Sequence, residues 1–196
     1  MKFDSRTRFL TESALMVALA TVLSMVKIIP LPMEGSLTLL SMLPICVIAF
    51  RYGVLRGLGV AFVYACFQLA LGLPAVLSWG LAPHVFLGTA MLDYILPYTA
   101  LGLAGLFGAK RLASMICGVT LALSTRFLSH FLSGVIIFRF FDQWELFGRV
   151  FESRPYLYSL AYNGVYMLPE LILTLIAVIL LYQIPVMRRL ITPTSH

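Results

Sequence analysis

The chain has 196 residues, of which 61% are hydrophobic and 11% are charged, and its formal net charge is +6. A soluble domain usually carries about 25% charged residues, so a chain this apolar has more apolar side chains than one core can bury, and the surplus is expected to face lipid. The basic residues come in twos and threes between apolar runs rather than in one stripe, which argues against nucleic-acid binding.

Six apolar runs are candidate transmembrane helices, since about 20 helical residues cross the apolar core of a bilayer. They cover residues 9–28, 37–50, 54–72, 87–107, 112–138 and 157–183. The first run is too long for a signal-peptide core and no small-residue cleavage site follows it, so we expect a retained helix. The second is short and contains Pro44. The sequence therefore predicts an all-α membrane protein, a bundle of six transmembrane helices that forms a single domain over 1–196.

The positive-inside rule orients these spans. With a cytoplasmic N-terminus, the inner segments hold Lys2, Arg6, Arg8, Arg51, Arg56, Lys110, Arg111, Arg188 and Arg189. The outer segments hold Lys27, Arg139, Arg149 and Arg154, which are balanced by Glu34, Asp142, Glu145 and Glu152. Both termini are therefore predicted to be cytoplasmic. The predicted outer segments 29–36, 72–86 and 139–156 are the longer connections, which suits capture of a solute from outside.

The first span contains two small residues four positions apart, Ala14 and Ala18. This spacing lets another helix approach closely, and that helix belongs either to this chain or to a partner. The three cysteines, Cys46, Cys66 and Cys117, lie in apolar stretches without CxxC spacing. We therefore expect no disulfide framework, no metal site and no cofactor.

Four ionisable residues stand out away from the ends of the predicted spans, where a charged group costs at least about 2.5–3.5 kcal/mol on insertion scales. They are Asp93, Arg126, His130 and Glu170. Asp93 forms either a structural ion pair with Arg126 or His130, or a site for a cationic or hydrogen-bond-donating ligand. The next residue, Tyr94, adds a ring and a hydroxyl group nearby.

The fifth span presents a polar stripe. Arg126, His130, Gly134 and Phe138 recur every four residues and therefore share one helix face. This face offers a cation, an imidazole, a gap without a side chain and an aromatic ring. A binding wall is one interpretation; the other is that His130 makes a helix-to-helix hydrogen bond and Gly134 permits close packing.

The sixth span begins with polar and aromatic residues at helical spacing. Asn163 lies one turn after Ser159, and Tyr166 lies one turn after Tyr162. A belt of tyrosines at the membrane interface is one explanation, but a buried amide such as Asn163 needs hydrogen-bond partners. Together, the carboxylate, imidazole, amide and rings of the last three spans suit a flat, positively charged heteroaromatic ligand.

These motifs resemble the thiamine-specific substrate-binding subunits of energy-coupling factor transporters, across nearly the whole chain. The segments that carry the resemblance include LTESALMVALA from Leu10, GSLT from Gly35, LDY from Leu92, RFLSHFLSGV from Arg126 and YSLAYN from Tyr158. The resemblance implies a small bundle of six helices with both ends in the cytoplasm. It also implies that Ala14 and Ala18 dock against a shared transmembrane coupling subunit.

The resemblance further implies a set of substrate-binding residues. They are Asp93, Tyr94, His130, Gly134, Phe138, Tyr158, Asn163 and Tyr64. Some relatives have glutamate in place of Asp93, and tryptophan in place of Phe138 and Tyr64. The two tryptophans of this chain, Trp79 and Trp144, lie in predicted outer segments and are candidates to cap the pocket.

The expected function is therefore high-affinity capture of thiamine at a bacterial cell membrane, with ATP hydrolysis performed by a separate pair of partner subunits. The chain itself has no GxxxxGK[ST] phosphate loop. Three alternatives stay open: the same architecture with another vitamin or a pyrimidine precursor, a stand-alone secondary transporter, and an intramembrane enzyme. The absence of an internal repeat argues against the secondary transporter, and the absence of GxSG, HExxH and paired carboxylates argues against the enzyme.

Overall fold

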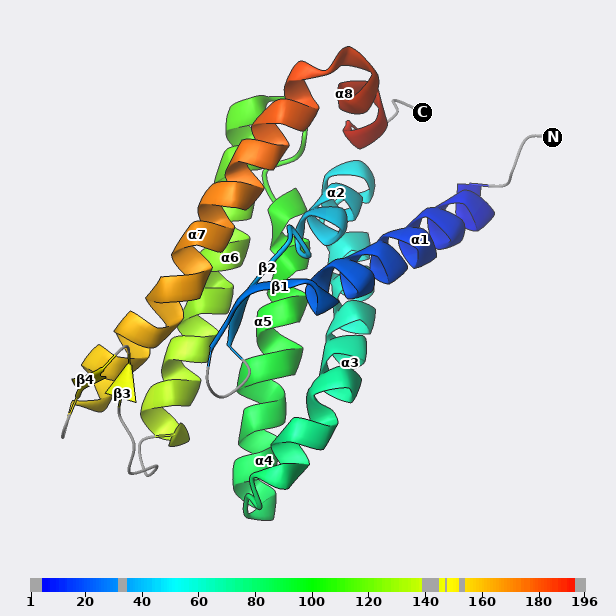
Figure 1. The fold of residues 1–196 in the computed structure, drawn as a ribbon. Helices are drawn as coiled ribbons and strands as arrows, with labels where there is room; N and C mark the ends of the chain where they lie inside the picture. Colours follow the sequence, from blue (N-terminus) through cyan, green and yellow to red (C-terminus); the bar gives the residue numbers. More distant parts are fainter. Residues whose placement is uncertain (1–4, 32–34, 139–144, 147, 152–153, 193–196) are drawn as a thin grey trace.

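The computed structural model describes residues 5–31, 35–138, 145–146, 148–151 and 154–192, which form a helical bundle with two short hairpins (Figure 1). In chain order the elements are α1 (Ser5–Met25), β1 (Lys27–Pro30), β2 (Ser36–Thr38), α2 (Leu43–Tyr52), α3 (Val54–Ser78), α4 (Pro83–Thr89), a π-helical segment (Ala90–Ile95), α5 (Leu96–Thr99), a 3-10 segment (Ala100–Gly105), α6 (Leu112–Ile136), β3 (Glu145–Leu146), β4 (Arg149–Val150), α7 (Pro155–Gln183) and α8 (Pro185–Ile191). The elements from α4 to the 3-10 segment follow one another directly, and we call them the composite helix Pro83–Gly105.

Five helices among the described residues are long and apolar enough to cross a membrane: α1, α3, the composite helix, α6 and α7. Large apolar side chains cover their outer surface, and Leu10, Leu55 and Leu168 expose 64%, 82% and 60% of their area. Soluble monomers rarely expose contiguous apolar surface on this scale. The outer surface of the bundle is therefore apolar, as in a membrane protein, and this agrees with the hydropathy of the sequence.

The predicted second span, 37–50, differs most from the structure. Strand β2 and a turn occupy its first part, and the helix begins only at Leu43. Leu40 has a positive φ of 56°, which lies outside the right-handed helical region, so a helix cannot run through this residue. Pro44 then lies in the first turn of α2, where N–H groups have no partner within the helix, so the missing N–H group of proline costs no helical hydrogen bond. The resulting helix has 10 residues and is shorter than the other candidate spans.

The predicted outer segment 72–86 is largely helical. Helix α3 continues through Pro74 to Ser78, and α4 begins at Pro83. The backbone N–H groups of Trp79 and Gly80 donate to carbonyl groups of the last turn of α3, and Gly80 has a positive φ of 62° that closes the turn. This connection is therefore a tight turn rather than a long loop.

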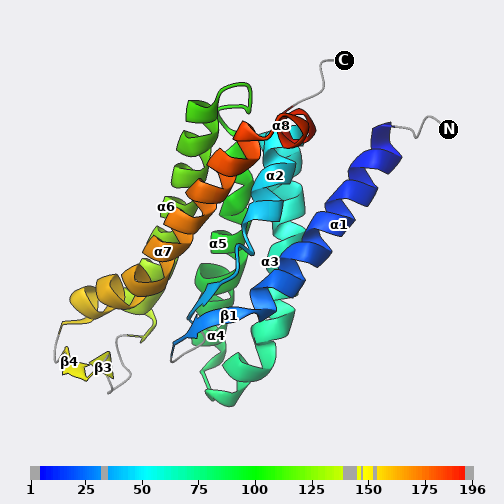
Figure 2. The same cartoon turned by 45° about the horizontal axis from the view of Figure 1, so that its top comes forward.

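Strands β1 and β2 form an antiparallel hairpin in which Ile29 pairs with Leu37. The hairpin follows α1 and lies across the bundle between α1 and α7 (Figure 2). From the end of α1 it runs toward the end of the bundle that contains α4 (Figure 1). The beginning of α1, helix α2 and helix α8 lie toward the opposite end (Figure 1).

A carboxylate at that opposite end joins three helices. Glu12 of α1 forms an ion pair with Arg51 at 2.8 Å and accepts hydrogen bonds from Arg51 Nη2 at 3.1 Å and from the Tyr52 hydroxyl group at 2.7 Å, both residues lying at the end of α2. Arg51 also donates to the carbonyl oxygen of Leu190 in α8. Because the carboxylate is satisfied by these donors, α1 is held to the bundle at this end although few of its side chains are buried.

Glycines let the backbone of the composite helix contact the backbones of neighbouring helices. A Cβ atom at Gly102 would clash with the backbone of Gly57 in α3, and one at Gly118 of α6 would clash with the backbone of Ala104. Small residues at helix contacts permit this approach in membrane bundles, where close van der Waals packing replaces the hydrophobic effect. The composite helix is therefore the central element of the bundle.

The variant Gly102→Ala tests this packing. We expect it to lower the free energy of unfolding by about 1–3 kcal/mol, since the added methyl group forces a backbone shift. Gly164→Ala in α7 is the matched control, because a Cβ atom there meets nothing within 4 Å. Thermal melts of the purified protein in detergent measure both, and equal melting temperatures would contradict the prediction.

Candidate functional site

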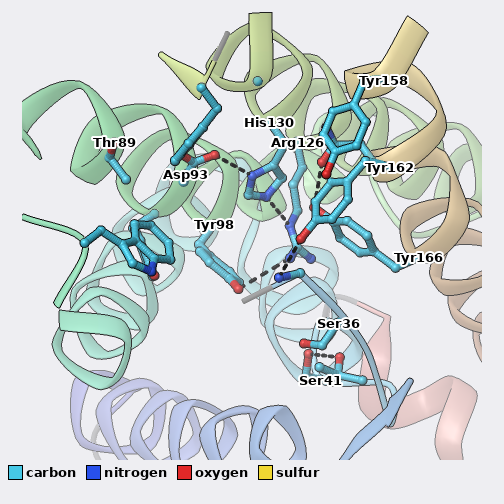
Figure 3. Close-up of a pocket in the computed structure, with 17 residues that line it drawn as sticks. Ser36, Ser41, Thr89, Asp93, Tyr98, Arg126, His130, Tyr158, Tyr162 and Tyr166 are labelled. Carbon is cyan, nitrogen blue, oxygen red and sulfur yellow. Dashed lines mark hydrogen bonds and ion pairs between the residues drawn. The ribbon is translucent and has the colours of Figure 1, made fainter. Parts of the chain in front are cut away.

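One pocket brings together residues from β2, the turn after α3, the composite helix, α6 and α7 (Figure 3). Its empty volume, counted out to its open mouth, is about 850 Å³. The lining residues are Gly35, Ser36, Thr38, Ser41, Trp79, Thr89, Asp93, Tyr94, Tyr98, Arg126, His130, Gly134, Phe138, Tyr158, Tyr162, Asn163 and Tyr166.

Asp93 lies in the π-helical segment Ala90–Ile95. Pro97 follows four residues later, and because proline has no N–H group it cannot donate the α-helical hydrogen bond to the Asp93 carbonyl oxygen. A π-helical turn accommodates such an interruption, and turns of this kind are frequent at functional sites. The local sequence therefore explains why the helix is irregular at the residue that carries the carboxylate.

Both oxygen atoms of the Asp93 carboxylate have partners on α6. Nδ1 of His130 lies 3.0 Å from Oδ1, and the Ser133 hydroxyl group donates to Oδ2. On its other side His130 faces Arg126, whose Nε lies 3.4 Å from Nε2. Since a guanidinium N–H group only donates, Nε2 accepts, and Nδ1 carries the proton that His130 donates to Asp93. The network thus assigns one tautomer to the imidazole.

Arg126 is a buried cation at the base of this network, with 4% of its area exposed. Its guanidinium group donates to the Met42 sulfur atom and to the Tyr98 hydroxyl oxygen, and it lies 4.5 Å from the centre of the Tyr98 ring. Within the described part of the chain, no carboxylate lies within ion-pair distance of it. A thioether, a phenol and an aromatic face therefore stabilise the charge instead.

Three tyrosines of α7 form the facing wall. The rings of Tyr158 and Tyr162 are stacked at 5.7 Å with an interplanar angle of 21°, and the rings of Tyr162 and Tyr166 meet edge to face at 5.9 Å. Figure 3 shows these rings across the cavity from Asp93. The wall offers aromatic faces and edges on which a flat ligand can stack.

Asn163 is anchored within this wall. Its amide nitrogen donates to the Ser159 carbonyl oxygen at 2.9 Å, and its amide oxygen accepts from the Tyr166 hydroxyl group at 2.8 Å. Ser159 in turn lies where a Cβ atom of Gly134 would be, so α6 and α7 approach closely beside the pocket. Both interpretations of Gly134 from the sequence therefore hold: it lines the cavity, and it permits close packing of α6 on α7.

The hairpin covers part of the cavity. The backbone N–H group of Gly35 donates to the Tyr162 hydroxyl group at 3.0 Å. The Thr38 hydroxyl group donates to Oε1 of buried Glu170 at 2.6 Å and lies 2.7 Å from the Ser41 hydroxyl oxygen. Glu170 thus lies behind the pocket wall and ties the hairpin to α7.

Seven of the eight predicted substrate-binding residues line the pocket: Asp93, Tyr94, His130, Gly134, Phe138, Tyr158 and Asn163. Tyr64 is not among the lining residues. It is fully buried, and its ring packs edge to face on Tyr98, which does line the cavity. The helix face of α3 that carries Tyr64 belongs to the core, so this residue lies one layer behind the site.

One of the two tryptophans that were predicted to cap the pocket lies in its lining. Trp79 lines the pocket, with its ring 5.9 Å from that of Phe138, whereas Trp144 lies outside the described residues. Among the lining residues that the sequence interpretation did not assign are Thr89 and Tyr98. Thr89 precedes Asp93 by four residues, a spacing that places both on one helix face and could have identified it.

The remaining predicted residues lie elsewhere. Ala14 and Ala18 line an apolar groove between α1 and α3, on the opposite side of α3 from the composite helix. His84 is exposed on α4. Among the described residues, no three His, Cys, Asp or Glu side chains are grouped so that they can hold a metal ion.

Comparisons with known proteins agree on one relationship. A family model described as "Thiamine transporter protein (Thia_YuaJ)" matches residues 10–188. The chain is 30% identical over 189 residues to the thiamine transporter ThiT of Bacillus subtilis (strain 168), which covers 89% of this chain and 90% of that relative. In fold it is similar to a solved structure of ThiT from Listeria monocytogenes, with a TM-score of 0.68, 23% identity, and coverage of 94% of this chain and 99% of that chain.

The contact between α6 and α7 beside the pocket gives a prediction. We expect Gly134→Ala to destabilise the protein by about 1–3 kcal/mol, because the new methyl group meets the side chain of Ser159. Adding Ser159→Gly removes that side chain and is expected to restore part of the loss. Melting temperatures of the two single variants and the double variant measure the coupling, and strictly additive effects would contradict it.

Proposed function

The chain belongs to the family of thiamine transporter proteins, and from this premise we propose that it is the thiamine-capturing subunit of an energy-coupling factor importer in the bacterial cell membrane. The observation that carries the proposal is the pocket itself, in which the Asp93–His130 pair faces the tyrosines of α7 inside an apolar bundle. No catalytic role is proposed for any residue.

The chemistry of the pocket suits thiamine, which joins an aminopyrimidine to a positively charged thiazolium ring. The Asp93 carboxylate is the acidic group of the lining and can accept a hydrogen bond from an amino group. The stacked rings of Tyr158 and Tyr162 offer faces for a flat cation. We propose that Tyr94, Gly134, Phe138 and Asn163 complete the contact surface.

Tyr64 has a different role in this proposal. Because its ring packs on Tyr98 behind the lining, it supports the shape of the pocket and does not touch the ligand. Arg126 lies next to the same Tyr98 ring, so the positive part of a bound ligand is expected to lie nearer to Asp93 and the tyrosines of α7 than to Arg126.

We further propose that α2 is the sixth span and that both termini are cytoplasmic. The end of α2, the beginning of α3 and α8 carry the basic residues Arg51, Arg56, Arg188 and Arg189, and α2 and α8 lie at the end of the bundle away from α4, which agrees with the positive-inside rule (Figure 1). The hairpin, α4 and the pocket mouth then face the outer side. A ligand would enter from outside, as capture requires.

The energy source lies outside this chain in our proposal. A pair of ATPase subunits would hydrolyse ATP, and a transmembrane coupling subunit would dock against α1. The groove lined by Ala14 and Ala18 supports this docking because it is apolar, and because these small residues on its rim let another helix approach.

Binding of thiamine to the purified subunit in detergent tests the proposal. Asp93→Asn keeps the size of the side chain but removes its charge, and we expect thiamine affinity to fall about 10–100-fold, since hydrogen bonds to charged groups contribute about 1.5–3 kcal/mol. Glu12→Gln is the matched control, because this carboxylate lies on α1 away from the pocket. Isothermal titration measures all three proteins. A wild-type protein that does not bind thiamine would overturn the proposal.

Docking on α1 is tested separately. The double variant Ala14→Leu/Ala18→Leu fills the groove, so we expect the purified subunit to bind thiamine normally while thiamine uptake by cells is lost. Leu15→Phe adds volume to an exposed position of α1 that does not line the groove and serves as the control. Normal uptake by the double variant would contradict docking at this groove.

A further inference from the structure

Thr89 is a buried polar residue of the pocket lining that has no partner. It is the last residue of α4, and only 1% of its area is exposed. Its hydroxyl group makes no hydrogen bond to any residue that the structure describes. A buried hydroxyl group without a partner costs free energy, so its position calls for an explanation.

Other threonines of this protein show the usual solution. In a helix, a threonine hydroxyl group can donate to the carbonyl oxygen four residues earlier, which satisfies its hydrogen. Thr11, Thr21, Thr125 and Thr174 all do so, at 2.9, 2.8, 2.9 and 2.7 Å. Thr89 departs from this pattern, which leaves its hydrogen available to a group outside its own helix.

Thr89 itself lines the cavity, so the cavity is the space beside it that a group of another molecule can enter. Its neighbour Gly88 is packed against Ile137 at the end of α6, so this part of α4 is covered by protein. Figure 3 shows Thr89 and Asp93 on one wall of the pocket, with Tyr158 and Tyr162 on the other. Thr89 precedes Asp93 by one helical turn, and both line the same cavity.

We propose that the Thr89 hydroxyl group donates a hydrogen bond to an acceptor atom of the ligand, beside the group that Asp93 accepts. A donor and an acceptor one turn apart match the edge of an aromatic ring on which an amino group and a ring nitrogen are adjacent. Asp93 takes the amino hydrogen, and Thr89 donates to the ring nitrogen. This inference rests on the proposed function and assigns Thr89 as a residue that determines specificity.

Three variants separate this role from a structural one. Thr89→Val replaces the hydroxyl group by a methyl group of similar size, and Thr89→Ser keeps the hydroxyl group. Thr99→Val is the matched control, because the Thr99 hydroxyl oxygen is likewise buried without a partner in the described structure but does not line the pocket. Since Thr89 has no hydrogen bond to any described residue that the change would remove, the melting temperature of ligand-free Thr89→Val is expected to equal or exceed that of the wild type.

Isothermal titration with thiamine is expected to show about tenfold weaker binding for Thr89→Val, and near-normal binding for Thr89→Ser and Thr99→Val. A thiamine analogue with CH in place of the ring nitrogen next to the amino-bearing carbon supplies the second arm. Wild type and Thr89→Val should bind this analogue equally. If wild type and Thr89→Val bind thiamine equally, the proposed role of Thr89 is wrong. It is also wrong if Thr89→Val loses affinity equally for thiamine and for the analogue; neither result bears on the proposed function. A wild-type protein that does not bind thiamine overturns the proposed function as well.

Discussion

The hydrogen bond between Asp93 and His130 connects the central helix of the bundle to α6, and the pocket is arranged around it. A carboxylate within a lipid-embedded bundle is stable only with partners, and α6 supplies both His130 and Ser133. The imidazole also accepts from Arg126, so the position of each group depends on the next. The carboxylate is thereby held at the pocket wall in one orientation before any ligand arrives, which reduces the entropy cost of binding.

The backbone around this network is irregular for physical reasons that the sequence contains. Pro97 removes one helical hydrogen bond, and a π-helical segment accommodates the loss at Asp93. Further along the same helix, Gly102 lets α3 approach at backbone distance. One end of the composite helix is therefore tightly packed while the other end is open enough to form a wall of the cavity. The tightly packed end of this helix stabilises the bundle, and the other end carries the site.

Two buried ionisable groups near the pocket have different kinds of partner. Glu170 receives a hydrogen bond from Thr38 and so ties the hairpin to α7. Arg126 relies on Met42 and on the ring and hydroxyl group of Tyr98. Glu170 lies behind the pocket wall, whereas Arg126 lines the cavity but directs its charge to Met42 and Tyr98, so the Asp93 carboxylate and the aromatic rings are the groups left to receive a cation. This combination matches the cationic, flat ligand of the proposed function.

The sequence by itself determined the class of the protein. Long apolar runs identify membrane helices because a backbone in lipid must satisfy its hydrogen bonds within each helix, and the family resemblance drawn from short motifs is confirmed by the family match. Helical spacing also placed His130 and Gly134 on one face of α6, and both line the pocket. The hairpin in place of a helix at 37–42 and the position of Tyr64 behind Tyr98 were decided by the tertiary structure. They depend on contacts between distant segments, such as the Thr38–Glu170 bond across 132 residues of sequence, and no local pattern encodes which helix faces meet.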